Sequence, residues 1–181
     1  MTFLITAILL ISAKFVYDYL HLKWLLRANP LLYVDYVEKY AREYEVDKFL
    51  IYAIIKTESD FRTDAVSSAG ARGLMQITEE TFDWLSVYRL RESGKVFDHM
   101  FIADDNIRYG SYLITYHLRN FGDIDCALAA YFAGDNTVIR WLNNPDFSQD
   151  GKTLSEVPDP DTRHYIHKVN TAYEIYLKLY S

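Results

Sequence analysis

The sequence predicts a mainly α-helical protein with one folded domain behind an apolar leader. Its 181 residues include seven glycines and four prolines, fewer turn formers than a fold of many short strands requires. Apolar residues recur at helical spacing along most of the chain, and half of all residues are hydrophobic. A chain of this length can bury a core of its own. We therefore expect an all-α fold.

The N-terminal segment, residues 1–27, is predicted to be separate from a body formed by residues 28–181. It begins with a charge-free run over residues 2–13, TFLITAILLISA. This run is shorter than the ~20 apolar residues of a membrane-spanning helix. It can be an uncleaved signal anchor, a cleaved signal peptide or a buried core helix. The first two interpretations both place the body outside the cytoplasm.

The first half of the body shows two helix signals. Asn29 and Pro30 are typical of a helix start, and apolar residues follow at helical spacing over residues 31–44. Asp47 can cap a second helix over residues 48–59. This second helix is apolar on nearly every side, which predicts that it is buried in the core.

The second half shows the same pattern of caps and helices. Thr78, followed by two glutamates, is typical of the start of a short helix. Asp104 or Asp105 can cap a long helix that Gly122 ends, and Asp125 can begin the next one. The remaining helices are expected over residues 104–121, 125–133, 136–142 and 162–180, and loops over residues 60–72, 86–100 and 143–161.

Composition and motifs exclude several classes of function. The single cysteine, Cys126, cannot form an intrachain disulfide or a cysteine-based metal site. The net charge of −6 disfavours nucleic-acid binding. No P-loop, HExxH or GxGxxG motif is present, and the five histidines show no ligand spacing. We therefore expect no metal and no organic cofactor.

Glu58 is the carboxylate that the sequence places in an unusual environment. It lies at the end of the apolar helix, where partial burial would favour its protonated form. A general acid needs this form near neutral pH, although a glutamate at a helix end can also point to solvent. The residues that follow favour a site, because Ser68, Gly70 and Gly73 allow a tight backbone. Gln76 then offers both a donor and an acceptor to a sugar.

Four segments, in order, resemble the signatures of lytic transglycosylases related to soluble lytic transglycosylase. The first combines TESDF with AVSSAGARGLMQI, and the region of resemblance extends over about residues 36–176. The segments are residues 57–77, NIRYGSYL at residues 106–113, AAYFAG with the following V and RW at residues 129–141, and DTRHYI at residues 161–166.

This resemblance implies a lysozyme-like helical fold, similar to that of goose-type lysozyme. It implies cleavage of the β-1,4 bond between N-acetylmuramic acid and N-acetylglucosamine in peptidoglycan, with Glu58 as the single catalytic acid and base. The C6 hydroxyl of the muramic acid would attack C1 and form a 1,6-anhydro ring. The partners expected are glycan strands and, through the N-terminal segment, the membrane. The protein would be a monomer with an extracytoplasmic catalytic domain on a single-pass bacterial membrane anchor, or secreted after signal cleavage.

The resemblance also implies which residues surround Glu58. The substrate-binding positions are Ser59, Ser68, Met75, Gln76 and Tyr131, and Tyr131 is expected to face Glu58. Further candidates are Asn106, Tyr112, Asp161 and Tyr165. Each of these can also be a core or turn residue, and for Met75 both interpretations are equally supported. Asp60 and Asp64 are interpreted as loop acids, not as a second catalytic carboxylate.

Three positions depart from the family pattern. Phe132 stands where the family has Asn, Asp161 where it has Glu, and Glu79 where Pro is common. These departures leave Glu58 in place and bear on the sugar subsites. Two other functions stay open: a hydrolase of goose-lysozyme type on the same fold, and a catalytically silent cell-wall-binding protein.

Overall fold

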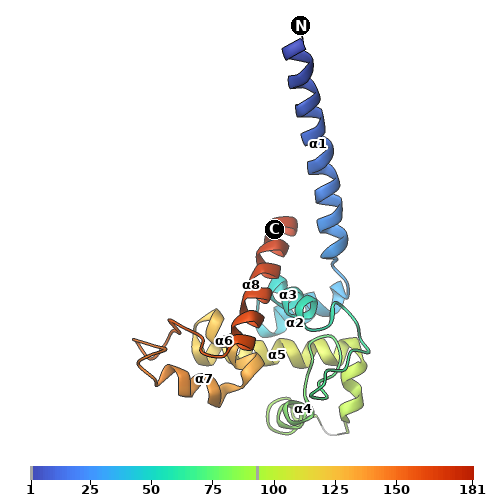
Figure 1. Ribbon diagram of the computed structural model, residues 1–181. Helices are drawn as coiled ribbons and strands as arrows, with labels where there is room; N and C mark the ends of the chain where they lie inside the picture. Colours follow the sequence, from blue (N-terminus) through green and yellow to red (C-terminus); the bar gives the residue numbers. More distant parts are fainter. Residues whose placement is uncertain (1, 93) are drawn as a thin grey trace. The chain divides into compact units, whose positions relative to one another are not determined.

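The structure is a computed structural model that describes residues 2–92 and 94–181, with side chains from residue 10 onward (Figure 1). The chain forms two compact units, Met1–Leu31 and Leu32–Ser181. The elements are α1 (Thr2–Ala28), α2 (Val34–Tyr44), α3 (Lys48–Ser59), α4 (Glu79–Trp84), the π-helical turn η1 (Leu85–Arg89), the 3-10 helix η2 (Phe97–Phe101), α5 (Ala103–Phe121), α6 (Ile124–Ala133), α7 (Asp135–Leu142) and α8 (Pro160–Tyr180). Within the described residues, β-type pairing is limited to isolated bridges, so the predicted all-α fold is confirmed.

The first unit consists mainly of α1. The predicted helix start at Asn29 and Pro30 is wrong, because Asn29 belongs to the end of α1. Its backbone and side-chain amides both donate to the Leu25 carbonyl, each at 2.9 Å. The second helix begins only at Val34, after Tyr33 in a left-handed conformation. Within the part of the chain that the structure describes, no helix has both the length and the apolarity to cross a membrane.

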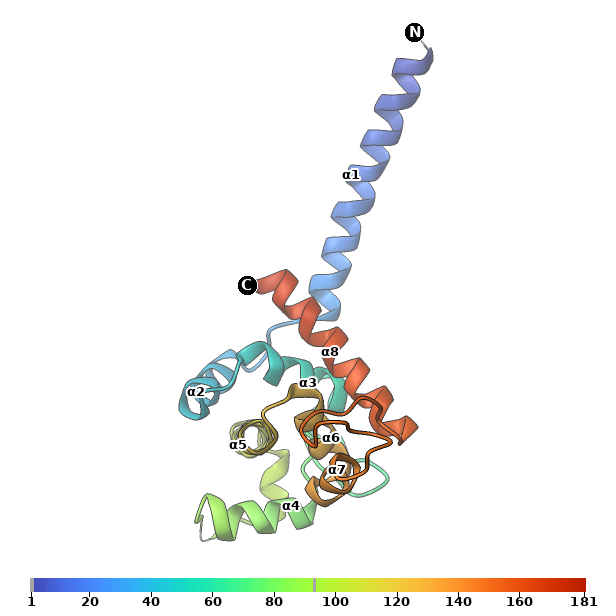
Figure 2. The same ribbon diagram turned by 90° about the vertical axis from the view of Figure 1, so that its left-hand side faces the viewer.

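The second unit is a bundle built around α3 and α5. The apolar helix α3 packs mainly against α8, and α5 packs against α2 on one side and α6 on another. Both views show α4 on the side of α5 opposite α3 (Figures 1 and 2). The side chains of α3 from Phe49 to Ile55 are all buried, which confirms the prediction that this helix lies in the core. Its last turn, which carries Glu58, is therefore fixed by the surrounding helices.

Local capping signals set several helix starts. The Asp47 carboxylate accepts from the backbone N–H of Phe49 at 2.7 Å, and Thr78 accepts from that of Thr81 at 3.3 Å. Both predicted caps are confirmed, as is the end of α5 at Gly122, where φ is 69°.

The cap predicted for α5 is wrong, and α6 begins one residue before the predicted Asp125. The start of α6 is capped by Asp123 and not by Asp125, which lies in the first turn. The start of α5 has no side-chain cap, and Asp104 and Asp105 lie in its first turn instead. Acidic residues are favourable both at the N-cap and in the first turn, because a carboxylate in the first turn also interacts with the helix dipole. Sequence spacing alone does not distinguish them.

The segment after α4 is more regular than the loop predicted for residues 86–100. It contains η1 and η2, which pack beside α4 against α5. Their apolar residues form a buried cluster with those of α4 and α5 and with Ile77, which precedes α4. The other members are Phe82, Leu85, Met100, Tyr109 and Leu113. This cluster holds α4 in place against α5.

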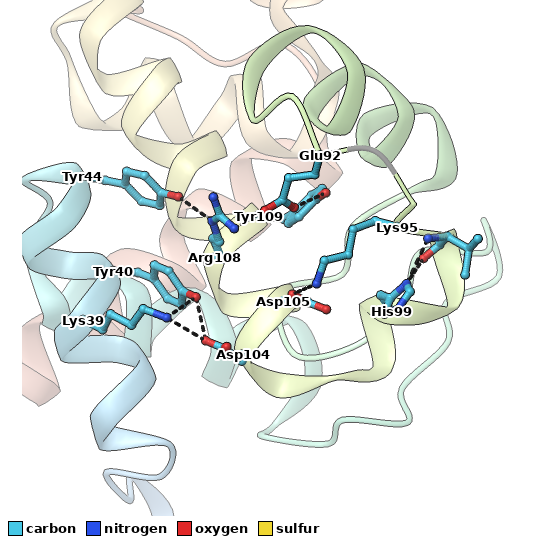
Figure 3. A network of polar contacts seen from close by, with 11 residues as sticks. Lys39, Tyr40, Tyr44, Glu92, Lys95, His99, Asp104, Asp105, Arg108 and Tyr109 are labelled. Carbon is cyan, nitrogen blue, oxygen red and sulfur yellow. Dashed lines mark hydrogen bonds and ion pairs between the residues drawn. The ribbon is translucent and has the colours of Figure 1, made fainter.

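A polar network also attaches this segment to α5 (Figure 3). Arg108 forms an ion pair with Glu92 and donates to the Tyr44 hydroxyl at 3.2 Å. The Tyr109 hydroxyl donates to the other oxygen of Glu92 at 2.9 Å. The same helix is joined to α2 by the Tyr40 hydroxyl, which donates to Asp104 at 2.6 Å. Further contacts in the figure are those of Lys39, Lys95, Asp105 and His99.

Candidate active site

Glu58 lies in the last turn of α3 and is partly buried. Burial is the main cause that raises the pKa of its carboxyl from 4.5 to about 7. The Tyr165 hydroxyl and the charge of Lys168 act in the opposite direction, but they do not outweigh burial. Near neutral pH this carboxyl can therefore either give up or accept a proton, which is the property that acid–base catalysis needs.

Two tyrosines from different helices converge on Glu58. Tyr165 of α8 and Tyr131 of α6 both have a pKa raised well above the ordinary value, first by burial and then by the negative charge of Glu58. The Tyr165 hydroxyl faces the carboxylate, although the pair does not reach the geometry of a full hydrogen bond. Both tyrosines are expected to remain protonated, and Tyr165 is the one whose hydroxyl proton is free to point toward the carboxylate, because the Tyr131 hydroxyl donates to a backbone carbonyl.

The GLMQ turn, residues 73–76, is held in place by Asn106. The side-chain oxygen of Asn106 accepts from the Met75 backbone N–H at 2.7 Å. Its amide nitrogen donates to the carbonyls of Arg72 at 2.9 Å and Met100 at 2.8 Å. Asn106 is completely buried, so these contacts give it a positioning role and leave no surface for a sugar.

Ser59 of α3, the helix that carries Glu58, and Tyr131 of α6 also hold this turn. The Ser59 hydroxyl donates to the Leu74 carbonyl at 2.8 Å, and the Tyr131 hydroxyl donates to the Met75 carbonyl at 2.7 Å. The GLMQ turn is thus fixed from three elements: α3, α5 and α6. A carboxylate beside such a rigid turn keeps one orientation relative to anything bound there.

Gln76 closes the turn with its own side chain. Its amide nitrogen donates to the carbonyls of Gly73 at 2.9 Å and Ala65 at 3.1 Å, and its backbone is left-handed with φ of 50°. A sugar contact at Gln76 would therefore use the side-chain oxygen. Gly73 is required for a steric reason, because a Cβ there would lie 2.0 Å from the Met100 carbonyl oxygen.

The other predicted positions lie in different surroundings. The Met75 side chain is completely buried against Gly110, so this residue reaches the site through its backbone. Ser68 is exposed in the turn before Gly70, and Asp161 is exposed in the first turn of α8. Tyr112 packs edge-on against Tyr44 of α2, with ring centroids 5.4 Å apart. Among the described residues, no hydrogen bond or ion pair joins Ser68, Tyr112 or Asp161 to the group around Glu58.

A pocket of about 560 Å³ lies between α4, α5 and the junction of α6 with α7. Its wall includes Tyr131 and Phe132, so it adjoins the surroundings of Glu58 without including Glu58 itself. Trp84 and the hydroxyls of threonines line it, a mixture of aromatic and polar groups that suits a carbohydrate. His117 and Asp135 meet at 2.7 Å in the same wall.

Sequence reasoning missed two neighbours of the site. Phe132 was recognised only as a departure from a pattern, yet its ring stacks on Tyr165 with centroids 4.7 Å apart. Lys168, one helical turn after Tyr165 on α8, was not noticed, and no local signal could have shown that it acts on Glu58. Among the described residues, no three His, Cys, Asp or Glu side chains come close enough to hold a metal.

Comparisons with known proteins agree on one family. The transglycosylase SLT domain family matches residues 35–154. The structure is similar to the 70-kDa soluble lytic transglycosylase from Escherichia coli, with 27% identity and a TM-score of 0.76 over 85% of this chain. It is also similar to an inactive Glu-to-Gln mutant of the lytic transglycosylase Slt from Pseudomonas aeruginosa, with 27% identity and a TM-score of 0.72 over 83% of this chain.

A third match is the 70-kDa enzyme in complex with bulgecin A, with 25% identity and a TM-score of 0.75 over 85% of this chain. In all three cases this chain covers only 25% of the length of the matched protein. The matches confirm the expected lysozyme-like helical fold and the relation to lytic transglycosylases.

Proposed function

Because this chain belongs to the transglycosylase SLT domain family, we propose that it is a peptidoglycan lytic transglycosylase with Glu58 as its general acid and base. The observation that carries the proposal is the partly buried Glu58 carboxyl, whose pKa of about 7 suits both roles. The inactive mutant of the similar Pseudomonas enzyme carries a Glu-to-Gln exchange, so that enzyme needs a glutamate, which supports the same need here.

In the first step, Glu58 donates its proton to the oxygen between muramic acid C1 and glucosamine C4. The C1–O bond breaks and the glucosamine leaves with a free 4-hydroxyl. The acetamido group of the muramic acid can stabilise the charge at C1, which replaces a second carboxylate of the enzyme. Tyr165, whose hydroxyl faces Glu58, keeps the carboxyl turned toward the bond that is cleaved, and Tyr131 fixes the neighbouring turn through the Met75 carbonyl.

In the second step, Glu58 takes the proton of the muramic acid C6 hydroxyl, and that oxygen bonds to C1. The product is a 1,6-anhydro ring, no water is consumed, and Glu58 regains its proton. The nucleophile is already part of the reacting sugar, so only its orientation must be fixed.

The nearby acids support this route over hydrolysis. A hydrolase with two carboxylates needs one that can direct water at the sugar. The Asp60 side chain is 70% exposed and pairs with Lys56, and Asp64 is exposed in the following loop. Neither one has the partial burial that Glu58 has.

The test is a mass-spectrometric analysis of peptidoglycan digested with the purified chain. We expect muropeptides with 1,6-anhydromuramoyl ends, one water lighter than reducing ends, and no release by Glu58→Gln. Asp60→Asn is the control and should digest like the wild type. Reducing ends alone would show a hydrolase, and an inert wild-type chain that still sediments with peptidoglycan would show a wall-binding protein.

A further inference from the structure

Phe132 is an exposed aromatic residue whose orientation the fold nevertheless fixes. It lies in the last turn of α6, and 48% of it is accessible to solvent. One face of its ring stacks on Tyr165 with centroids 4.7 Å apart and an angle of 24° between the planes. Stacking of this kind stabilises one ring orientation.

The stacking partner of Phe132 and its neighbour in the chain are themselves held in place. Tyr165 is only 5% exposed and faces Glu58, and the preceding Tyr131 donates its hydroxyl to the Met75 carbonyl at 2.7 Å. An exposed aromatic ring is thereby held beside Tyr165, the residue whose hydroxyl faces Glu58.

Phe132 also forms part of the wall of the 560 Å³ pocket, together with Trp84 and threonine hydroxyls. It therefore lies where the surroundings of Glu58 meet the pocket. A ligand that extends from Glu58 into the pocket would run beside this ring. A glycan strand cleaved at Glu58 continues on both sides of the cleaved bond, because it is a polymer, and the pocket offers room for one of these sides.

We propose that Phe132 is a specificity-determining platform on which one pyranose ring of the glycan strand stacks. This inference rests on the proposed function. In β-1,4-linked N-acetylhexosamines all ring substituents are equatorial, so each face of the sugar presents C–H bonds only. Such a face suits the electron-rich face of an aromatic ring, whereas an asparagine at this position could offer only hydrogen bonds.

The experiment measures binding without turnover. A tetrasaccharide of N-acetylglucosamine is titrated by calorimetry into the full chain carrying Glu58→Gln, alone and combined with substitutions of Phe132. Phe132→Asn should weaken binding roughly fivefold, and Phe132→Tyr should stay within about twofold of the parent. Phe132→Leu still covers Tyr165 but has no flat face, so it should bind more weakly than Phe132→Tyr.

A matched control separates the platform from a general effect of lost apolar surface. Ile139 of α7 is 46% exposed and does not line the pocket, so Ile139→Asn should bind like the parent. Thermal unfolding of each variant shows whether it remains folded. Equal binding by the parent, Phe132→Asn and Phe132→Leu would overturn the platform and leave the proposed function standing. A parent that binds no tetrasaccharide would contradict the proposed function as well.

Discussion

The raised pKa of Glu58 suits catalysis, but it lowers the free energy of unfolding at high pH. Its carboxyl titrates near 4.5 when the chain is unfolded and at about 7 in the folded protein. Between these values the folded protein binds more protons than the unfolded chain, so stability falls as the pH rises through this range. A functional group that is buried for its chemistry is thus expected to reduce stability at neutral and alkaline pH.

The corresponding prediction concerns Glu58→Gln. At pH 4 its free energy of unfolding should equal that of the wild type, and at pH 8 it should be higher by about 3 kcal/mol, because the glutamine carries no charge to bury. Urea unfolding at the two pH values measures the difference. Asp60→Asn, an exchange at an exposed acid, should show the wild-type dependence on pH. A difference for Glu58→Gln that is the same at pH 4 and pH 8 would argue against the raised pKa.

Tyr131 connects α6 to the GLMQ turn through a single hydrogen bond of its hydroxyl. Tyr131→Phe removes the hydrogen bond to the Met75 carbonyl, which should lower stability by about 1 kcal/mol. Turnover of peptidoglycan should fall at least tenfold, because the turn beside Glu58 loses one of its supports and with it the alignment of a bound strand. Tyr173→Phe loses a bond of similar length, 2.8 Å to Asp47, outside the site. Tyr173→Phe should lose a similar amount of stability but keep its turnover of peptidoglycan. Equal turnover by Tyr131→Phe and Tyr173→Phe would contradict a role for Tyr131 in the site.

At the scale of elements, the site depends on how closely α5 approaches the GLMQ turn. Gly110 of α5 leaves the space that the Met75 side chain fills, and Asn106, one turn earlier, binds the Met75 backbone. The helix therefore supports the turn in two ways: Gly110 allows close packing of Met75, and the buried Asn106 amide binds the Met75 backbone. Arg108 and Glu92 attach the neighbouring segment to the same helix (Figure 3).

Gly110→Ala tests this approach. Alanine normally stabilises a helix relative to glycine. Here its Cβ would lie 2.3 Å from the Met75 sulfur and 2.6 Å from the Met75 Cβ, so we expect a loss of about 2 kcal/mol and reduced turnover. Ser111→Ala is the matched control on the same helix. Its buried hydroxyl has no partner among the described residues, so thermal unfolding should show little change. A stabilised Gly110→Ala variant would contradict the close packing.

At the scale of the whole molecule, the chain consists of two units: the N-terminal unit, which is mainly α1, and the helical body that carries Glu58. The substrate that we propose lies outside the cytoplasm, so we also propose that the body is exported. A C-terminal alkaline phosphatase fusion produced in bacteria should be active, whereas a fusion without residues 1–27 should be inactive. A cytoplasmic reporter at the same position is the reciprocal control. A bright cytoplasmic reporter on the full chain, with inactive phosphatase, would exclude export.

The sequence by itself determined the helical fold and the position of the acid. Helices form from local periodicity and from caps that act within three or four residues, so α3, the caps at Asp47 and Thr78, and the end of α5 at Gly122 could be predicted. Glu58 could be found because an apolar helix with a carboxylate at its end is itself a local pattern.

Only the tertiary structure decided which side chains meet Glu58 and what each of them does. Tyr165 lies more than one hundred residues after Glu58, and its position depends on how α8 packs against α3. The packing of α5 likewise uses all the hydrogen-bonding groups of the Asn106 side chain inside the protein. Local spacing does not encode contacts between distant helices, because these contacts form only when the core is buried and the helices adopt a common packing.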